Sequence, residues 1–360
     1  MVDCRLRIAD CRFVAGALAA MGLGLVGCRQ DVEQVPAAPS EAVPGVAASP
    51  VPATRRPTPP TPPAARPKPI APGPVEIWRE FSGERAFEEV RKQVEVGPRP
   101  SGTPEIAKAR ALIEDGLRSS GWEVELQNFT NETPRGPVLF VNLIGRFSPT
   151  GKNPASRDTQ RAIVCSHYDT KRFSTIRFVG ASDGASSTGA LLELARVLAL
   201  DPALAAQIEL VFFDGEEAFV QFTALGDPKP DGLFGSRFYA AQLRASGRAA
   251  QFRFGLLWDM IGDRDLTITL PHNSPPDLTR EILASADALG LRQHFSKYER
   301  SILDDHEPLS VMARIPTIDL IDFDYPPWHT ADDTLARLAP ESLQKVGAVT
   351  LHYLRRALGK

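Results

Sequence analysis

The segment that most constrains this 360-residue chain is residues 208–222, which read IELVFFDGEEAFVQF. It opens with an apolar run whose length and composition are typical of a strand buried on both faces. The run ends abruptly at Asp214-Gly215-Glu216-Glu217. Adjacent carboxylates directly after a core strand are costly to bury unless a cation meets them, and α/β sheets place their ligand crevice at the carboxyl ends of their strands. The segment therefore favours a functional site at this point over a solvated acidic turn.

Three other strand-like runs end in polar residues of the same kind. They lead to His167-Tyr168-Asp169, to Asp259 and to Trp328-His329, and Asp183 lies in a loop that follows the first of them. Histidine, aspartate and glutamate side chains from separate strand ends make a metal constellation, and this mixture of donors favours zinc. Within the first motif, Asp169 is positioned to orient His167. Standing alone, Asp183 would also fit an N-terminal cap of the helix that follows it.

Strand and helix patterns alternate along residues 75–360, which we expect to form one catalytic domain with a three-layer α/β/α sandwich around a mixed, mainly parallel sheet. A hydrophobic fraction of 43% is sufficient for such a core. The expected strands are residues 122–129, 137–147, 162–167, 208–213, 254–259, 266–270 and 317–321. The expected helices are residues 87–94, a helix capped by Ser101 or Thr103 that stops near Gly121, residues 187–200, 236–245 and 277–289, a short helix after Asp305, and residues 341–358.

The amino terminus reads as an export signal rather than as part of the fold. Arginines precede an apolar stretch at residues 13–26, which closes on Leu25-Val26-Gly27-Cys28. This ending resembles a bacterial lipoprotein box, so residues 1–27 are interpreted as a signal peptide and Cys28 as the lipidated first residue of an exported protein on the periplasmic or cell-surface side. The alternatives are a plain signal peptide or a mis-assigned start, because Asp3 and Asp10 are unusual in such a region.

Residues 28–74 are rich in proline and alanine and have no apolar periodicity, which is typical of a disordered spacer. Once the signal peptide is removed and Cys28 is modified, Cys165 is left without a partner for a disulfide. The formal net charge of -3 and the lack of a basic cluster give no indication of nucleic-acid binding. We expect a monomer that touches the membrane only through its lipid anchor.

Six ordered motifs carry a family resemblance. They are HYDTKRF, FVGASDG, FFDGEEAF, LFGSRFYA, DDHEPL and PPWHTADD, and the upstream segments GPRPSGTP and FTNETPRG extend the match to almost all of residues 75–360. In this order they resemble the glutaminyl-peptide cyclotransferases, which belong to the zinc-dependent aminopeptidase-like superfamily. The resemblance implies a zinc-exopeptidase-like fold and an enzyme that acts on the amino termini of peptides and proteins.

The resemblance also implies roles for individual residues. One catalytic zinc would be held by Asp183, Glu217 and His329. Glu216 would be the general acid and base, with Asp259 and Asp304 accepting hydrogen bonds around the substrate amine. The substrate pocket would be lined by Trp328, Phe222 and Tyr325. The implied reaction closes an amino-terminal glutamine to pyroglutamate and releases ammonia, with zinc as Lewis acid and Glu216 moving the proton.

Two alternatives stay open at this point. A two-zinc aminopeptidase would use the same residues, with His167 and Asp259 holding a second metal, Asp183 bridging, and Glu216 activating a water. The sequence around the ligands favours the cyclase: an aromatic residue six positions past Glu216, the DDH element, and tryptophan directly before His329. A non-catalytic binding domain on the same fold is a remote third possibility, because it predicts a lost ligand and none is missing.

Overall fold

The computed structural model describes residues 75–148 and 161–359, and its main feature is a six-stranded sheet with the order β1-β2-β4-β3-β5-β8. Its strands are β1 (Glu123–Thr133), β2 (Gly136–Arg146), β3 (Arg161–His167), β4 (Ile208–Phe213), β5 (Phe252–Asp259) and β8 (Thr317–Ile321). Strands β4, β3, β5 and β8 run parallel, whereas β2 is antiparallel to both β1 and β4. The expected mixed, mainly parallel sheet is therefore confirmed.

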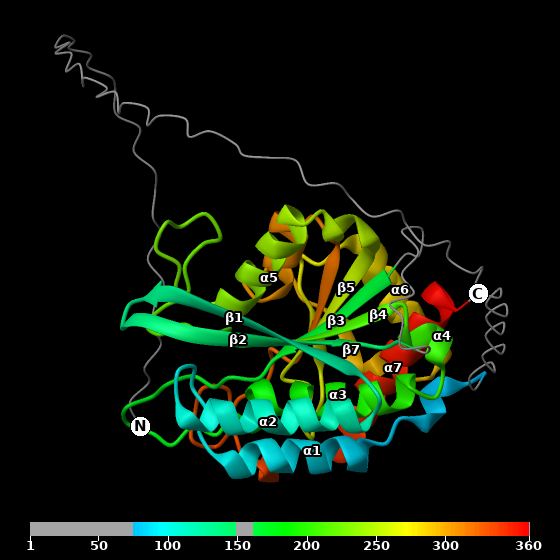
Figure 1. Cartoon of the computed structure of the whole chain (residues 1–360). Coiled ribbons are helices and arrows are strands. Elements are labelled where there is room, and N and C mark those ends of the chain that lie inside the picture. The colour runs from blue at the N-terminus through cyan, green and yellow to red at the C-terminus, as the bar shows by residue number, and fades with distance from the viewer. Residues whose placement is uncertain (1–74, 149–160, 360) are drawn as a thin grey trace, which may run out of the picture. The chain divides into compact units, whose positions relative to one another are not determined.

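Helices cover both faces of this sheet (Figure 1). One face carries α1 (Gly83–Val96), α2 (Pro104–Ser119), α3 (Ser187–Leu198) and α7 (Pro340–Leu358), and α6 (Pro276–Ala288) packs against α7. The opposite face carries α5 (Phe234–Ala245) with the helical turn η5 (Pro308–Met312) beside it. The shorter elements are η1 (Ile77–Glu80), η2 (Ala181–Ser186), α4 (Pro202–Ala205), η3 (Arg248–Gln251), β6 (Ile268–Leu270), η4 (Arg292–His294), β7 (Phe295–Lys297) and η6 (Leu335–Arg337).

Alternate residues of the central strands supply two separate cores, one on each face of the sheet. Val164, Leu210 and Leu256 are aligned across three strands and belong to the large core under α1, α3 and α7. The next aligned row, Cys165, Val211 and Leu257, belongs to a smaller core that includes residues of α5. Because successive side chains of a strand point to opposite faces, uniformly apolar strands are buried on both sides. This is the three-layer arrangement that the sequence predicts.

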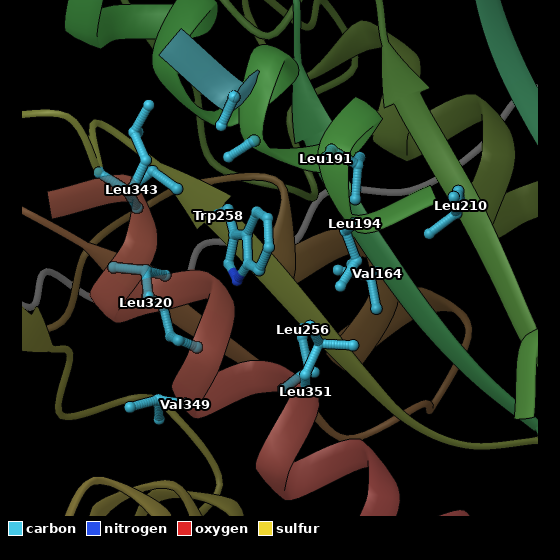
Figure 2. Packing of buried hydrophobic residues seen from close by; sticks show 14 of the residues in the cluster. Val164, Leu191, Leu194, Leu210, Leu256, Trp258, Leu320, Leu343, Val349 and Leu351 are labelled. Carbon is cyan, nitrogen blue, oxygen red and sulfur yellow. The ribbon is translucent and has the colours of Figure 1, made fainter. Parts of the chain in front are cut away.

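Trp258 anchors the end of β5 inside the large core (Figure 2). Its side chain is fully buried, and its indole N–H donates to Thr350 Oγ1 of α7 at 3.2 Å. A buried tryptophan that satisfies its single donor in this way is fixed in position as well as packed. The next residue, Asp259, is therefore presented at the carboxyl edge of the sheet from a rigid base.

Local details differ from the sequence expectations in ways that chemistry explains. The cap of α2 is Thr103, whose Oγ1 accepts from the Ile106 N–H at 3.3 Å, whereas the Ser101 hydroxyl donates to Asp214 Oδ1 at 2.6 Å. The strand expected at residues 266–270 is only β6, and α4 and β7 were not predicted because elements of three or four residues have too little periodicity.

The predicted signal peptide, Cys28 and the spacer at residues 28–74 lie outside the described residues. Within residues 75–148 and 161–359, no helix combines the length and the apolar character needed to cross a bilayer.

Candidate metal centre and active site

The residues singled out in the sequence meet at the carboxyl edge of the parallel strands. His167 and Asp259 are the last residues of β3 and β5, and Glu216 and Glu217 follow the end of β4. In the sheet register His167 lies opposite Phe213, so the ends of β3 and β4 are level. Asp183 comes from η2 and His329 from the turn after β8. Five separate segments thus converge on one site.

The first donor set consists of Asp183, Glu217 and His329. His329 Nε2 lies 3.1 Å from Glu217 Oε1 and 3.3 Å from Asp183 Oδ2. Each of the three residues offers one donor atom, and these three atoms all lie within 4.8 Å of one another. Asp183 Oδ2 and Glu217 Oε2 are buried and accept no hydrogen bond from the described residues. An imidazole nitrogen and two carboxylates fit the ligand preferences of zinc.

A second donor set shares Asp183 with the first. His167 Nε2 lies 3.2 Å from Asp183 Oδ1 and 3.1 Å from Asp259 Oδ1. The two oxygens of Asp183 therefore face two different histidines, as a bridging carboxylate would. The geometry brings together the residues that a second metal would need.

Asp183 is held by its loop and not by the helix that follows. The N-cap of α3 is Ser186 and has no side-chain capping hydrogen bond, so the capping interpretation of Asp183 finds no support. The loop turns at Gly180 and Gly184, whose φ values are +52° and +90°, a region that costs glycine little. Asp333 accepts hydrogen bonds from the backbone N–H groups of Ser182 at 2.7 Å and Asp183 at 3.1 Å.

His329 also has an unusual backbone conformation, with φ at +55°. A non-glycine residue in the left-handed region costs about 1–3 kcal/mol and persists only where its surroundings impose it. Here the residue follows Pro326-Pro327-Trp328, and the Thr330 hydroxyl donates to the Pro327 carbonyl at 2.7 Å. The rigid turn predicted from the sequence therefore orients the imidazole toward the carboxylates.

Asp169 links the two acidic strand ends. Its Oδ1 lies 3.5 Å from His167 Nδ1, an ion-pair distance, and Nδ1 has no hydrogen-bond partner among the described residues, so the orienting role stays a prediction. Its carboxylate also accepts from the backbone N–H of Glu216 at 3.1 Å and of Glu217 at 3.3 Å. The same side chain thus fixes the loop that carries Glu216 and Glu217 relative to β3.

In the first donor set the electrostatics favour an ionised Asp183, whereas burial and the negative charge of Asp183 raise the pKa of Glu217. Burial would raise the pKa of Asp183, but hydrogen bonds to His167 and His329 outweigh it and hold this pKa below its usual range. Burial lowers the pKa of His329, whereas its hydrogen bonds to Asp183 and Glu217 raise that pKa to about 9. These shifts describe a site built to hold positive charge.

Glu216 stands in a different environment. Its side chain lines the site and is only 6% exposed. Burial raises the pKa of Glu216; His167 opposes this shift, and the negative charges of Glu217 and Asp304 add to it. A glutamic acid whose pKa is raised by its surroundings is suited to accept and return a proton.

These residues surround one cavity. Its polar wall is formed by Asp183, Glu216, Glu217, Asp259, Asp304 and His329. Its apolar wall is formed by Phe222, Met260, Ile302, Leu303, Ile321, Phe323 and Trp328. Trp328 is 40% exposed at this wall, and Phe222 lies beneath the Lys171 ammonium at 5.2 Å from Nζ to the ring centre.

Tyr325 is the one predicted pocket residue that does not line the cavity. It is 4% exposed, and its hydroxyl donates to Asp333 Oδ1 at 2.8 Å. The ring therefore packs behind the site, where it orients the carboxylate that holds the Asp183 loop.

Three residues that lie at the site were not predicted from the sequence to have a role there. Lys171 lies 3.4 Å from Glu217 Oε2, Asp333 holds the Asp183 loop, and Arg99 is buried behind that loop. Each of them falls inside a quoted motif, so a signal was present. Their partners are backbone groups or residues far away in the chain, which a motif does not reveal.

The chain is similar to known proteins in both sequence and structure. Residues 142–354 match the family described as peptidase family M28. The glutaminyl-peptide cyclotransferase-like protein of Bos taurus is 31% identical, and the match covers 72% of this chain and 72% of that protein. The crystal structure of an Acidobacteriales bacterium glutaminyl cyclase is 32% identical with a TM-score of 0.69, over 82% of this chain and 99% of that one.

A solved structure with a different name is also similar. It is a leucine aminopeptidase precursor from Bacteroides thetaiotaomicron, with 27% identity and a TM-score of 0.67, covering 76% of this chain and 97% of that one.

Proposed function

Because this chain belongs to peptidase family M28 and is related to glutaminyl-peptide cyclotransferases, we propose that it is a zinc-dependent glutaminyl-peptide cyclotransferase. It converts the amino-terminal glutamine of peptides and proteins to pyroglutamate and releases ammonia. The observation that carries the proposal is the cavity in which the donor set Asp183, Glu217 and His329 meets the protonatable Glu216. The structural similarity to a bacterial glutaminyl cyclase supports it.

In this proposal Asp183, Glu217 and His329 hold one zinc ion. When bound there, zinc supplies a Lewis acid for the oxygen of the substrate γ-carboxamide. Asp183 Oδ2 and Glu217 Oε2 are buried and accept no hydrogen bond from the described residues, and this is the observation that fits a metal to these residues. The ring nitrogen of His329, held by its strained turn, completes the set.

The reaction is an intramolecular acyl transfer. The α-amine nitrogen forms a bond with the side-chain carbonyl carbon of glutamine, and the bond from that carbon to the amide nitrogen breaks. Glu216 takes a proton from the α-amine and delivers it to the departing nitrogen, which leaves as ammonia. No water is consumed. Because the α-amine and the carboxamide belong to the same glutamine, the cavity has to hold the substrate in a bent conformation that brings them together.

The polar and apolar walls of the cavity are proposed to bind different parts of the substrate. The carboxylates of Asp259 and Asp304 line the cavity and are proposed to accept hydrogen bonds from the substrate amine. The rings of Trp328 and Phe222 lie on the apolar wall and are proposed to pack on the glutamine side chain. An apolar wall around a carboxyl acid also keeps its pKa raised, which the proton transfer by Glu216 requires.

A two-metal aminopeptidase is the second candidate, and one observation favours it. Asp183 Oδ1 faces His167 and Asp183 Oδ2 faces His329, as in a carboxylate that bridges two ions. In that case His167 and Asp259 would hold the second zinc, and Glu216 would activate a water for peptide hydrolysis. The names of the related proteins favour the cyclase.

One experiment separates the two candidates. Zinc per chain is measured on purified protein that lacks residues 1–27, alongside ammonia release from a glutaminyl peptide and aniline release from a leucyl-anilide. One zinc, ammonia release and an unreactive anilide are expected. Two zinc ions with anilide cleavage would replace the cyclase by the aminopeptidase, and the His167→Ala variant would then lose the second ion.

The export route is proposed from the sequence alone. Residues 1–27 are a signal peptide, Cys28 is lipidated, residues 28–74 are a disordered spacer, and residues 75–360 are the catalytic domain of a monomer that binds no nucleic acid. A full-length chain should fractionate with membranes, and Cys28→Ser should release it. Equal membrane association of both chains would contradict the lipid anchor.

A further inference from the structure

Arg99 is a fully buried arginine whose guanidinium binds only backbone. It lies in Gly97-Pro98-Arg99-Pro100 and is 0% exposed. Its Nε donates to the Tyr168 carbonyl at 2.8 Å, Nη1 to the Val179 carbonyl at 2.7 Å, and Nη2 to the Gly180 carbonyl at 3.0 Å. Among the described residues, no carboxylate pairs with it directly. A buried guanidinium is costly, so this one calls for an explanation.

The three acceptors belong to the two segments that carry the donor residues. Tyr168 stands between His167 and Asp169 at the end of β3, and Gly180 precedes Asp183 in the loop of residues 179–184. The backbone N–H of Arg99 also donates to Thr170 Oγ1 at 3.0 Å. One side chain therefore ties the strand end with His167 to the loop with Asp183.

The opposite side of the loop is held by a group of opposite charge. Asp333 accepts the N–H groups of Ser182 and Asp183, and its own Oδ1 accepts from the Tyr325 hydroxyl. A cation thus binds the carbonyl groups of the loop and an anion binds its N–H groups. These hydrogen bonds satisfy buried backbone groups at the start of η2.

The packing around the loop leaves little freedom. A Cβ atom at Gly184 would lie 3.3 Å from Arg99 Nη2 and 2.7 Å from the Asp169 carbonyl oxygen. A Cβ atom at Gly180 would lie 2.3 Å from the Asp183 carbonyl oxygen. The positions of Asp183 Oδ1 and Oδ2 relative to the two histidines therefore depend on where Arg99 holds the chain.

The charge of Arg99 has a second consequence. Burial lowers its pKa to about 10, while the negative charges of Asp169, Asp183 and Asp333 oppose this shift. The side chain remains protonated at neutral pH and offsets part of the repulsion between these carboxylates. An uncharged apolar side chain of the same volume would fill the space, but it would neither donate hydrogen bonds to the loop carbonyls nor offset the repulsion between the carboxylates.

We propose that Arg99 is a positioning residue for the metal donor set, which holds the loop of residues 179–184 against the end of β3 so that Asp183 faces both His167 and His329. The inference rests on the metal site of the proposed function and does not depend on the reaction catalysed there.

The matched control is Arg237, which has the same bonding pattern in another place. It is 9% exposed and donates to the backbone carbonyls of Thr223 at 2.8 Å and Leu225 at 3.0 Å. These carbonyls lie in a loop that carries none of the three proposed zinc ligands. Replacing either arginine removes a buried clamp, but only Arg99 is expected to affect the metal.

The test compares Arg99→Lys and Arg99→Met with Arg237→Lys and Arg237→Met. The zinc dissociation constant of each protein is measured by competition with a chromophoric chelator, and the stability of the zinc-free protein by urea unfolding. Residues that orient metal ligands typically cost about 10- to 100-fold in affinity when replaced. We expect about 100-fold weaker zinc binding for Arg99→Met, about 10-fold for Arg99→Lys, and less than about threefold for the Arg237 variants.

Equal zinc affinity in the Arg99 and Arg237 variants would overturn the proposal, whatever their stability. If Arg99→Met does not fold, the comparison of Arg99→Lys with Arg237→Lys decides, because both keep the charge and most of the volume. The readout needs no substrate. A wild-type protein that binds zinc but releases no ammonia would contradict the proposed cyclase and leave the role of Arg99 standing.

Discussion

Replacing Glu216 by glutamine separates proton transfer from metal binding. The carboxyl lines the cavity at 6% exposure, and no described side chain donates a hydrogen bond to it. Glutamine has nearly the same shape but cannot accept and return a proton. General acid–base catalysis typically contributes about 10²- to 10⁴-fold, so turnover should fall by this factor, which corresponds to a barrier higher by about 3–5 kcal/mol.

The same change should leave the fold and the metal in place. The negative charges of Glu217 and Asp304 contribute to the raised pKa of Glu216, after burial itself. A neutral amide removes this repulsion, so the unfolding free energy of the zinc-free protein should stay within about 1 kcal/mol of the wild type or rise. Zinc per chain should be unchanged, because Glu216 is not one of the three proposed ligands.

The assay is enzyme-coupled ammonia release at saturating glutaminyl peptide, with zinc measured on the same samples. Glu307→Gln is the control for a carboxyl-to-amide change, because Glu307 Oε1 accepts from Asn273 Nδ2 at 2.8 Å and does not line the cavity. It should retain turnover. If Glu216→Gln turned over at the wild-type rate, or lost zinc in step with activity, the assignment of Glu216 as acid and base would be refuted.

Three further outcomes are expected. Glu217→Ala and His329→Ala should each lose zinc together with activity, measured by metal analysis; unchanged zinc in both would mean that the ligand set is wrong. Phe222→Ala should raise the Michaelis constant without changing zinc per chain, and an unchanged constant would place the ring outside the substrate pocket. Burial raises the pKa of Asp322 to about 7, so its stabilising contribution is present below pH 4 and is lost as the pH rises through 7. The wild type should therefore lose on the order of 2 kcal/mol relative to Asp322→Asn between pH 5 and 8, and urea unfolding curves that keep a constant difference would contradict this.

The layers of the fold and the kinds of residue at the site could be predicted from the sequence. Uniformly apolar runs predicted strands buried on both faces, and β3, β4 and β5 are of this type. The glutamates after residue 213 and the histidine at the end of β3 marked the strand ends correctly. These features are local, because strand burial and strand ends are written in a few consecutive residues.

Which of these residues meet, and which groups hold them in place, could not be predicted without the three-dimensional structure. From the sequence, Asp183 could have been a helix cap. In the structure its loop is hydrogen-bonded to Arg99 on one side and to Asp333 on the other. Tyr325 was predicted to line the pocket, whereas in the structure its hydroxyl donates a hydrogen bond to Asp333.

The physical reason is that hydrogen bonds to backbone groups leave no signature in the side chain that accepts or donates them. Arg99 binds carbonyl groups about 70 to 80 positions away, and Asp333 binds N–H groups about 150 positions away. Distances of this kind follow from strand order and register, which no short motif contains.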